Sequence, residues 1–327
     1  MLPIRHGSTG QDHGREEETS SLPDIAMDER HFPYSLYGHQ FAMDTARDYD
    51  FQQLLRKFDI LEMYCDAPHE SFYACTPYCS IDVPIEEALQ FPQKISNRLP
   101  LQIQGTSRQL TLNNLKYLWC RYASHYFEWV NGLPELRMME QREKMSDLEV
   151  KVVSRQATKI ILLMISYWTF QRNYDGLVLG CGICSKHEGN QDELIGGDLA
   201  TLAALLHAHI ISTFKKMNLS RGEYLLLKAV ALFEALDEHF PPAICLIMET
   251  ALNKYRSALV SYMKRSHPEL EHEALLGRVQ ALLGTLTSLE VAKEFDNSRL
   301  IEAILRNNGD MRGRLTIGVH MDSNRMD

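Results

Sequence analysis

The sequence predicts an all-α domain with one short β-hairpin, and three segments carry that prediction. Residues 112–129 place apolar side chains at steps of three and four, the period of a helix that buries one face. Residues 160–170 are apolar on all sides apart from Ser166 and Thr169. This helix must be covered all round, and it is shorter than the roughly 20 residues that a bilayer requires. A short apolar run at 177–179 lies among glycines, which predicts the hairpin.

Composition bounds the class of protein. Of the 327 residues 45% are hydrophobic, and the net charge is -9, which argues against a general nucleic-acid surface. The seven scattered cysteines suit free thiols in a reducing compartment better than a disulfide framework. The first 30 residues lack the apolar core of a signal peptide, and no stretch is typical of a transmembrane helix. We therefore expect a protein of the cytosol or nucleus, without membrane association.

The chain divides into three expected regions. Residues 1–45 are of low hydrophobicity and are expected to be disordered, residues 46–306 form one domain, and residues 307–327 form a flexible tail. Within the domain a capping box, Ser220 to Glu223, opens a helix, and Pro241-Pro242 opens the next. Further helices are expected at 51–64, 85–89, 199–217, 269–293 and, after possible caps at 296–298, at 299–306.

Motifs that carry chemistry are scarce. The CxxC of Cys181 and Cys184 lacks a second ligand pair at the spacing of a zinc site, and His207 and His209 point to different faces of a helix. No phosphate-binding glycine loop, nucleophile elbow or zinc-protease motif is present. No catalytic residue, metal site or cofactor is expected, and an all-α enzyme is the least favoured function.

The aromatic residues of the 112–129 helix permit two interpretations. Trp119, Tyr122, Tyr126 and Trp129 can simply pack the core. Alternatively, part of the stripe lines a cavity for an apolar ligand, because ligand pockets are mostly apolar with a few placed polar groups.

Three segments resemble the ligand-binding domain of nuclear hormone receptors, particularly the divergent nematode type. FEWVNGLPEL (residues 127–136) looks like the end of the family's core helix. NLSRGEYLLLKAVALFEAL (residues 218–236) is similar to the family's L-S-x-x-E-x-x-L-L-K-A-I-x-L-F helix and is the most specific match. The segment from Arg278 to residue 286 is like the arginine-led helix of the family's dimer face. The resemblance implies a three-layer helical sandwich.

The resemblance also implies three sites. A ligand pocket would be lined by Leu115, Trp119, Tyr122, Met164 and Trp168. A groove for a coregulator helix would use Val130, Asn131, Val152 and Arg155, together with Leu300, Glu302 and Ile304 from a movable helix at 299–306. A dimer face would use Arg278, Leu282 and Leu286.

The sequence departs from the family pattern at several of these positions. Asn131, an uncharged amide, stands where the family has a basic residue that clamps the coregulator helix. In the 299–306 helix Glu302 directly follows two apolar residues, where the family keeps a spacer. The eight thiolates of the family's two zinc sites are not found before residue 51, so this chain is not expected to bind DNA directly.

The resemblance implies a nuclear transcription regulator that binds an apolar small molecule, a coregulator helix, or both. It could act as a homodimer or as a heterodimer with another nuclear receptor. The alternative is a ligandless interaction module, such as a dominant-negative partner or scaffold, whose pocket is filled by its own aromatic side chains.

Overall fold

The computed structural model describes residues 51–67, 78–103, 108–143, 146–185, 195–235 and 240–321. All of them belong to one compact unit, Ala46–Asp327. The expected disorder of residues 1–45 lies outside the described residues. The elements are α1 (Phe51–Asp66), α2 (Ile85–Gln90), η3 (Pro92–Lys94), β1 (Arg108–Gln109), α3 (Leu112–Asn131), α4 (Pro134–Glu143), α5 (Ser146–Arg172), β2 (Leu177–Gly180), β3 (Ile183–Ser185), α6 (Gly196–Leu206), the π-helix η4 (His207–Ile211), α7 (Ser212–Met217), α8 (Arg221–Phe233), α9 (Pro242–Ser266), α10 (His272–Arg306), η5 (Asn308–Asp310) and α11 (Arg314–His320).

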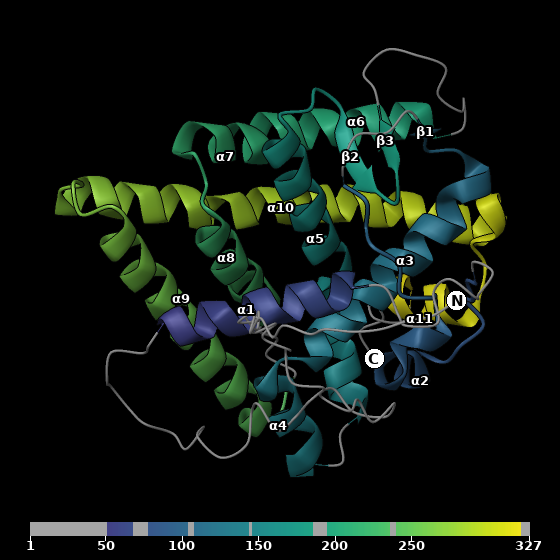
Figure 1. Cartoon of the computed structure of the whole chain (residues 1–327). Coiled ribbons are helices and arrows are strands. Elements are labelled where there is room, and N and C mark those ends of the chain that lie inside the picture. The colour runs from purple at the N-terminus through teal and green to yellow at the C-terminus, as the bar shows by residue number, and fades with distance from the viewer. Residues whose placement is uncertain are drawn as a thin grey trace, which may run out of the picture. The chain divides into compact units, whose positions relative to one another are not determined.

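The helices form three layers (Figure 1). Helices α1 and α3 make one outer layer, α5, α8 and α9 the middle layer, and α6, α7 and α10 the other outer layer. The all-α class and the layered helical sandwich that the sequence predicted are confirmed. The predicted hairpin is present as β2 and β3, which pair antiparallel, and β1 adds a parallel strand beside β3 that the sequence did not predict.

Helix α5 occupies the centre, as its all-round hydrophobicity predicted. It packs against α3, α8 and α10, and its residues from Ile160 to Thr169 are buried apart from Ile161. Tyr167 stacks face to face on Tyr224 of α8, with ring centroids 3.7 Å apart. Nearby, the buried ammonium of Lys228 lies 2.6 Å from the Glu62 carboxylate and 4.2 Å from the centre of the Trp129 ring. This cation thereby joins α8, α1 and α3.

Helices α6 and α7 continue through the π-helical turn η4 and together match the helix expected at 199–217. The segment Gly196–Met217 is long and apolar enough to cross a membrane by length and composition. In this fold it packs against α10, and its other side exposes His209, Lys215 and Lys216.

The end of the chain differs from the sequence prediction in two ways. The expected separate helix at 299–306 is the last part of α10, which runs unbroken from His272 to Arg306. The residues predicted to be caps lie inside this helix because they find other partners: the Asn297 side chain bonds to His320, and Ser298 Oγ donates to the carbonyl of Phe295. In place of a flexible tail from 307, the chain turns through η5 into the well-packed α11.

Candidate ligand and coregulator site

The predicted ligand-facing residues gather in the interior between α3 and α5. Trp119, Tyr122, Met164 and Trp168 are buried, and Leu115 is half-buried. The rings of Tyr122 and Trp168 lie 6.3 Å apart between centroids, and the Tyr122 hydroxyl donates a hydrogen bond to the carbonyl of Leu179 in β2. The structure therefore brings Tyr122 and Trp168 into contact, and it buries Trp119 and Met164 on the same two helices.

Helix α11 closes against this interior through its last residue. Trp119 Nε1 donates to His320 Nε2 at 2.9 Å, and His320 Nδ1 lies 2.7 Å from Asn297 Oδ1 (α10). Because the indole can only donate, Nε2 of His320 accepts and Nδ1 carries the proton that it gives to Asn297. Burial lowers the pKa of His320 to about 4, so the ring is neutral at physiological pH. One imidazole thus ties α11 to both α3 and α10.

A carboxyl group lies near Tyr122. Burial raises the pKa of Asp296 to about 7. Burial also raises the pKa of the Tyr122 hydroxyl, with Cys181 and Asp296 adding to the effect. By accessible surface Asp296 is half-buried. Sequence reasoning missed Asp296, Asn297 and His320, because 296–298 were interpreted as helix caps and His320 fell in the expected tail.

The predicted coregulator groove is covered by a segment of the same chain. Helix α2 packs against α3, α5 and α11. Asn131 Nδ2, at the end of α3, donates to the carbonyl of Leu89 in α2 at 2.6 Å. Val130 of α3 and Val152 of α5 are fully buried. The surface between α3, α5 and α11 is therefore occupied in this structure.

The other predicted groove residues lie elsewhere. The η5 turn that follows α10 meets the start of α3, where a Cβ on Gly309 would lie 2.7 Å from the Leu112 carbonyl oxygen. Asn131 is at the opposite end of α3, about 28 Å away at 1.5 Å per residue. In this structure Leu300, Glu302 and Ile304 are therefore not joined with Asn131. Ile304 is buried, Leu300 is half-buried, and Glu302 pairs with Arg299 and Arg306 of its own helix.

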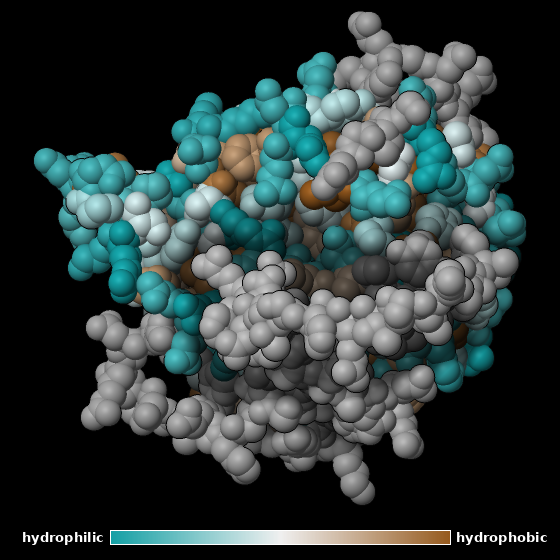
Figure 2. All heavy atoms as spheres, viewed as in Figure 1, coloured by the Kyte–Doolittle hydropathy of each residue, from teal (hydrophilic) through white to brown (hydrophobic). Residues whose placement is uncertain are grey.

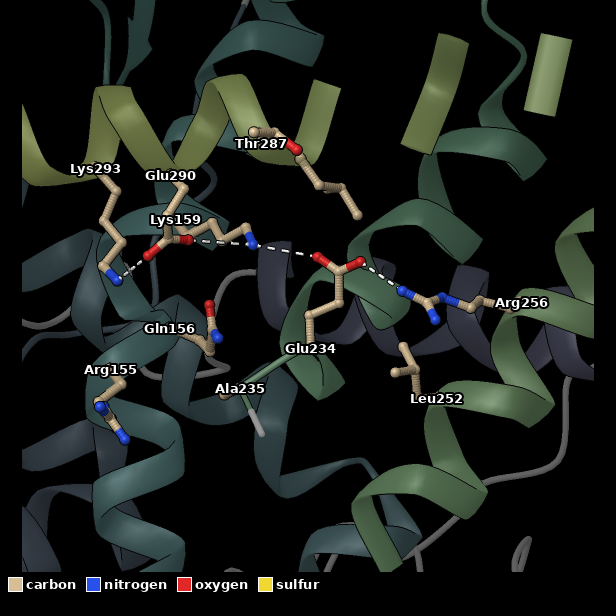
Figure 3. A pocket seen from close by; sticks show the side chains of 11 residues that line it. Arg155, Gln156, Lys159, Glu234, Ala235, Leu252, Arg256, Thr287, Glu290 and Lys293 are labelled. Atoms are coloured by element: carbon tan, nitrogen blue, oxygen red, sulfur yellow. Dashed lines mark hydrogen bonds and ion pairs between the residues drawn. The ribbon is translucent and has the colours of Figure 1, made fainter. Parts of the chain in front are cut away.

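Arg155 lines a half-open polar cleft of about 540 Å³ between α5, α8, α9 and α10 (Figure 3). A chain of ion pairs crosses the cleft: the buried ammonium of Lys159 lies 3.3 Å from both Glu234 and Glu290. Arg256 extends the chain at the Glu234 end and Lys293 at the Glu290 end. Burial alone would raise the pKa of Glu290, but the hydrogen bond from Lys293 and the charge of Lys159 outweigh it and hold the pKa low. The cleft is a polar joint between layers, and none of the predicted ligand-facing residues lines it.

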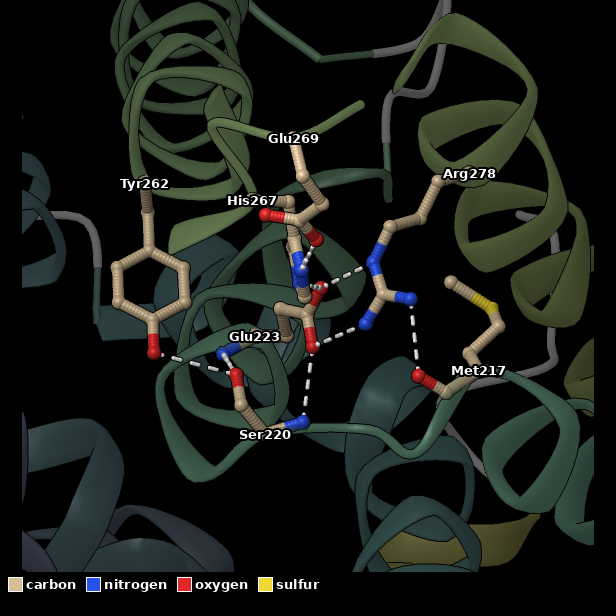
Figure 4. A network of polar contacts seen from close by, with 7 residues as sticks. All are labelled: Met217, Ser220, Glu223, Tyr262, His267, Glu269 and Arg278. Atoms are coloured by element: carbon tan, nitrogen blue, oxygen red, sulfur yellow. Dashed lines mark hydrogen bonds and ion pairs between the residues drawn. The ribbon is translucent and has the colours of Figure 1, made fainter. Parts of the chain in front are cut away.

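The predicted dimer-face residues face inward. The Arg278 guanidinium donates to both carboxylate oxygens of Glu223, at 2.7 and 2.9 Å, and to the Met217 carbonyl at 2.8 Å (Figure 4). Leu282 and Leu286 are buried. The large apolar side chains that α10 exposes are instead Leu276, Val291 and Leu305. On the face drawn in Figure 2 the corner where α9 meets α10 is hydrophilic.

Among the described residues no three His, Cys, Asp or Glu side chains are grouped closely enough to hold a metal ion. Cys181 lies in the β2–β3 turn and Cys184 in β3; both are buried, and neither forms a disulfide.

Comparison with known proteins identifies the family. The family model of the ligand-binding domain of nuclear hormone receptors matches residues 104–295, more than half of the chain. The chain belongs to this family. Nuclear hormone receptor family member nhr-4 of Caenorhabditis elegans is 23% identical over 249 residues, which cover 71% of this chain and 48% of that protein. Family member nhr-100 of the same organism is 23% identical over 202 residues, which cover 57% of this chain and 43% of that protein.

Membership of this family indicates the general class of protein. Nuclear receptor ligand-binding domains belong to ligand-regulated transcription factors and are generally not enzymes. The chain spans about half the length of the curated relatives it matches. The matched range of this receptor domain ends one residue before Asp296 and begins after α2. The groups that close the interior and cover the groove thus lie outside the segment that the family model matches.

Proposed function

We propose that this chain is the ligand-binding part of a nuclear transcription regulator, which binds an apolar small molecule between α3, α5 and α10 and thereby controls the docking of a coregulator helix beside α11. The aromatic side chains of α3 and α5 supply the apolar lining, and Asp296, Asn297 and His320 supply the few polar groups that orient a ligand. Leu115 and Met164 belong to the same proposed lining.

The bond between Trp119 and His320 carries this proposal. Trp119 belongs to the proposed lining, and His320 is the last residue of the helix that borders the groove. A ligand that shifts the indole of Trp119 would weaken or strengthen its bond to His320. The ligand would thereby change how firmly α11 is held. A ligand shifts a conformational equilibrium only by such a difference in contacts between two states.

Native mass spectrometry of the purified chain, followed by extraction into organic solvent, tests for a ligand. Met164→Trp, which overfills the proposed site, should abolish a stoichiometric apolar adduct. Met263→Trp is the matched control, because Met263 is equally buried but lies in α9. Retention of the adduct by both variants would contradict a ligand between α3 and α5. So would the absence of any adduct from both the native chain and the control.

A second function is favoured by the close packing of the same side chains. Trp119, Tyr122 and Met164 are all at most 6% exposed, as expected if the interior is filled by the protein itself. The domain would then act as a ligandless interaction module that pairs with itself or with another receptor. The same spectra distinguish this function: a clean mass without adduct, together with a persistent dimer, would support it.

A further inference from the structure

Helix α2 has the form of a short docking peptide. Ile85, Ala88 and Leu89 are buried, while Glu86 points to solvent. Residues at i, i+3 and i+4 lie on one face of a helix, so the three apolar side chains form a single contact stripe. Sequence analysis predicted a helix at this place but gave it no role.

The surface beneath α2 holds both of its ends. At the C-terminal end, where helix carbonyls lack partners within the helix, Asn131 Nδ2 donates to the Leu89 carbonyl at 2.6 Å. At the N-terminal end, Gly318 of α11 lies beside Ile85, and a Cβ on this glycine would make ordinary contact with the Ile85 side chain at 3.6 Å. Just before α2, the Leu315 amide of α11 donates to the Ile81 carbonyl at 2.8 Å.

This arrangement is that of an amphipathic helix bound in a groove, with apolar anchors at i, i+3 and i+4. We propose that α2 is a built-in occupant of the coregulator groove between α3, α5 and α11, and that a partner helix with the same apolar spacing must displace it to bind. The inference rests on the proposed function, because it concerns the regulation of the groove named there. The proposal also accounts for the amide of Asn131 at the position where the family has a basic residue. An amide suffices to hold a carbonyl of a helix that is tethered to the same chain.

The segment that carries α2 is closed at its base by main-chain contacts. The backbones of Cys79 and Ser96 form an isolated antiparallel β-bridge, and the Ser80 amide donates to the Ile95 carbonyl at 2.8 Å. These contacts tie the two ends of the segment to each other. Lys94 forms an ion pair with Glu87 inside the same segment. A six-residue helix is unstable by itself in water, so α2 owes its helical form to the groove.

Tethering sets the size of the effect. A segment on a short linker competes for the groove at an effective concentration in the millimolar range. A free helix binds only molecules whose groove is empty, so its apparent affinity equals its intrinsic affinity multiplied by the fraction of such molecules. Releasing α2 should therefore tighten binding of a free helix by about tenfold or more.

The test uses a fluorescein-labelled peptide of this chain's residues 82–94 as the probe and the 327-residue chain as the binder, followed by fluorescence polarisation. The double variant Ile85→Ser/Leu89→Ser should bind the peptide at least about tenfold more tightly than the unchanged chain. Glu86→Gln, a change on the exposed side of α2, should bind it as weakly as the unchanged chain. Equal affinity in all three proteins would overturn the proposal.

A third variant locates the binding. Adding Asn131→Leu to the double variant removes the donor that holds the end of the helix. The affinity for the peptide should then fall several-fold. Hydrogen exchange at residues 85–90 shows independently whether α2 has been released in a chain that is still folded. Tight binding of the peptide that survives Asn131→Leu, or release of α2 without a gain in affinity, would refute the proposal that a partner helix binds in the groove that α2 occupies. Neither readout depends on a small molecule, so failure of the ligand proposal would leave this result unchanged.

Discussion

Arg278 of α10 holds the fully buried carboxylate of Glu223, the first acidic residue of α8, with two hydrogen bonds of 2.7 and 2.9 Å. The Ser220 amide donates to the same carboxylate at 2.8 Å. Burial would raise the pKa of Glu223, but the Arg278 and Ser220 hydrogen bonds outweigh it and keep the pKa below its usual value. The capping box that was visible in sequence is thus also the anchor of α10 (Figure 4).

Arg278→Met should lower the free energy of unfolding by about 3–5 kcal/mol, because it leaves the Glu223 carboxylate buried and without its cation. Urea denaturation at pH 7 measures the change. Arg299→Met on the same helix is the control, because its ion pairs are near half exposed and such pairs contribute at most about 1 kcal/mol. Equal losses in the two variants would mean that the Glu223 pair is not specially stabilising.

Trp119→Phe should loosen α11 while leaving the rest of the fold in place. The variant keeps an aromatic ring but removes the donor to His320, a loss of about 1–2 kcal/mol. Hydrogen exchange of residues 314–320 should become faster. Tyr126→Phe also deletes one buried hydrogen bond, to the Val153 carbonyl, but its bond does not involve α11. Faster exchange of α11 in both variants would show general destabilisation rather than release of this helix.

His320 should stay neutral down to about pH 4, and the NMR shifts of its ring carbons measure this directly. Its ordinary pKa is about 6.5. Since the unfolded chain takes up this proton between about pH 6.5 and 4 and the folded chain does not, the contribution of His320 to stability falls as the pH falls through that window. The full loss is roughly 3 kcal/mol.

The raised pKa of Asp296 acts in the opposite direction across this whole window, because the folded chain there holds a proton that the unfolded chain releases. The stability of the native chain should therefore be compared with that of His320→Leu at each pH. The excess in free energy of unfolding of the native chain over His320→Leu should shrink on acidification. An excess that stays constant from pH 7 to 4 would contradict a neutral, buried His320.

Lys159→Met should cost about 1–3 kcal/mol, since it leaves Glu234 and Glu290 facing the cleft without their shared cation. Both carboxylates keep some contact with water and a second cation each, so the loss should be smaller than that for Arg278. Adding Glu290→Gln should recover part of the stability in urea denaturation. No recovery would show that packing of the lysine stem, rather than charge, is what matters.

Gly309→Ala should destabilise the turn between α10 and α11. Gly309 has φ of +61°, a conformation that disfavours side chains, and a Cβ would lie 2.7 Å from the Leu112 carbonyl oxygen. A loss of more than about 1 kcal/mol is expected in thermal unfolding. Gly284→Ala, in an open position of α10, should instead stabilise the protein by about 0.5–1 kcal/mol. The two substitutions should thus move the melting temperature in opposite directions.

Local patterns predicted most of the scaffold. The period of the 112–129 helix, the all-round hydrophobicity of 160–170 and the Ser220–Glu223 capping box each depend on neighbours within a few residues, and each was confirmed. The C-terminal end of α10 was not predicted, because Asp296, Asn297 and Ser298 resemble caps until their tertiary partners are known. Asn297 lies inside the helix, and its side chain bonds to His320, 23 residues away in sequence.

The sequence by itself determined the all-α class, the central place of α5 and the family, because burial periodicity and motif order are written in consecutive residues. Only the tertiary structure decided which surfaces are free. The family resemblance implied that Arg278, Leu282 and Leu286 form a dimer face, yet they pack inside the chain. Ile85, Ala88 and Leu89 carry the pattern of an ordinary short helix, yet they cover α3 and α5. The physical reason is that an apolar stripe specifies that it must be buried, whereas the partner that buries it is set by segments far away in sequence.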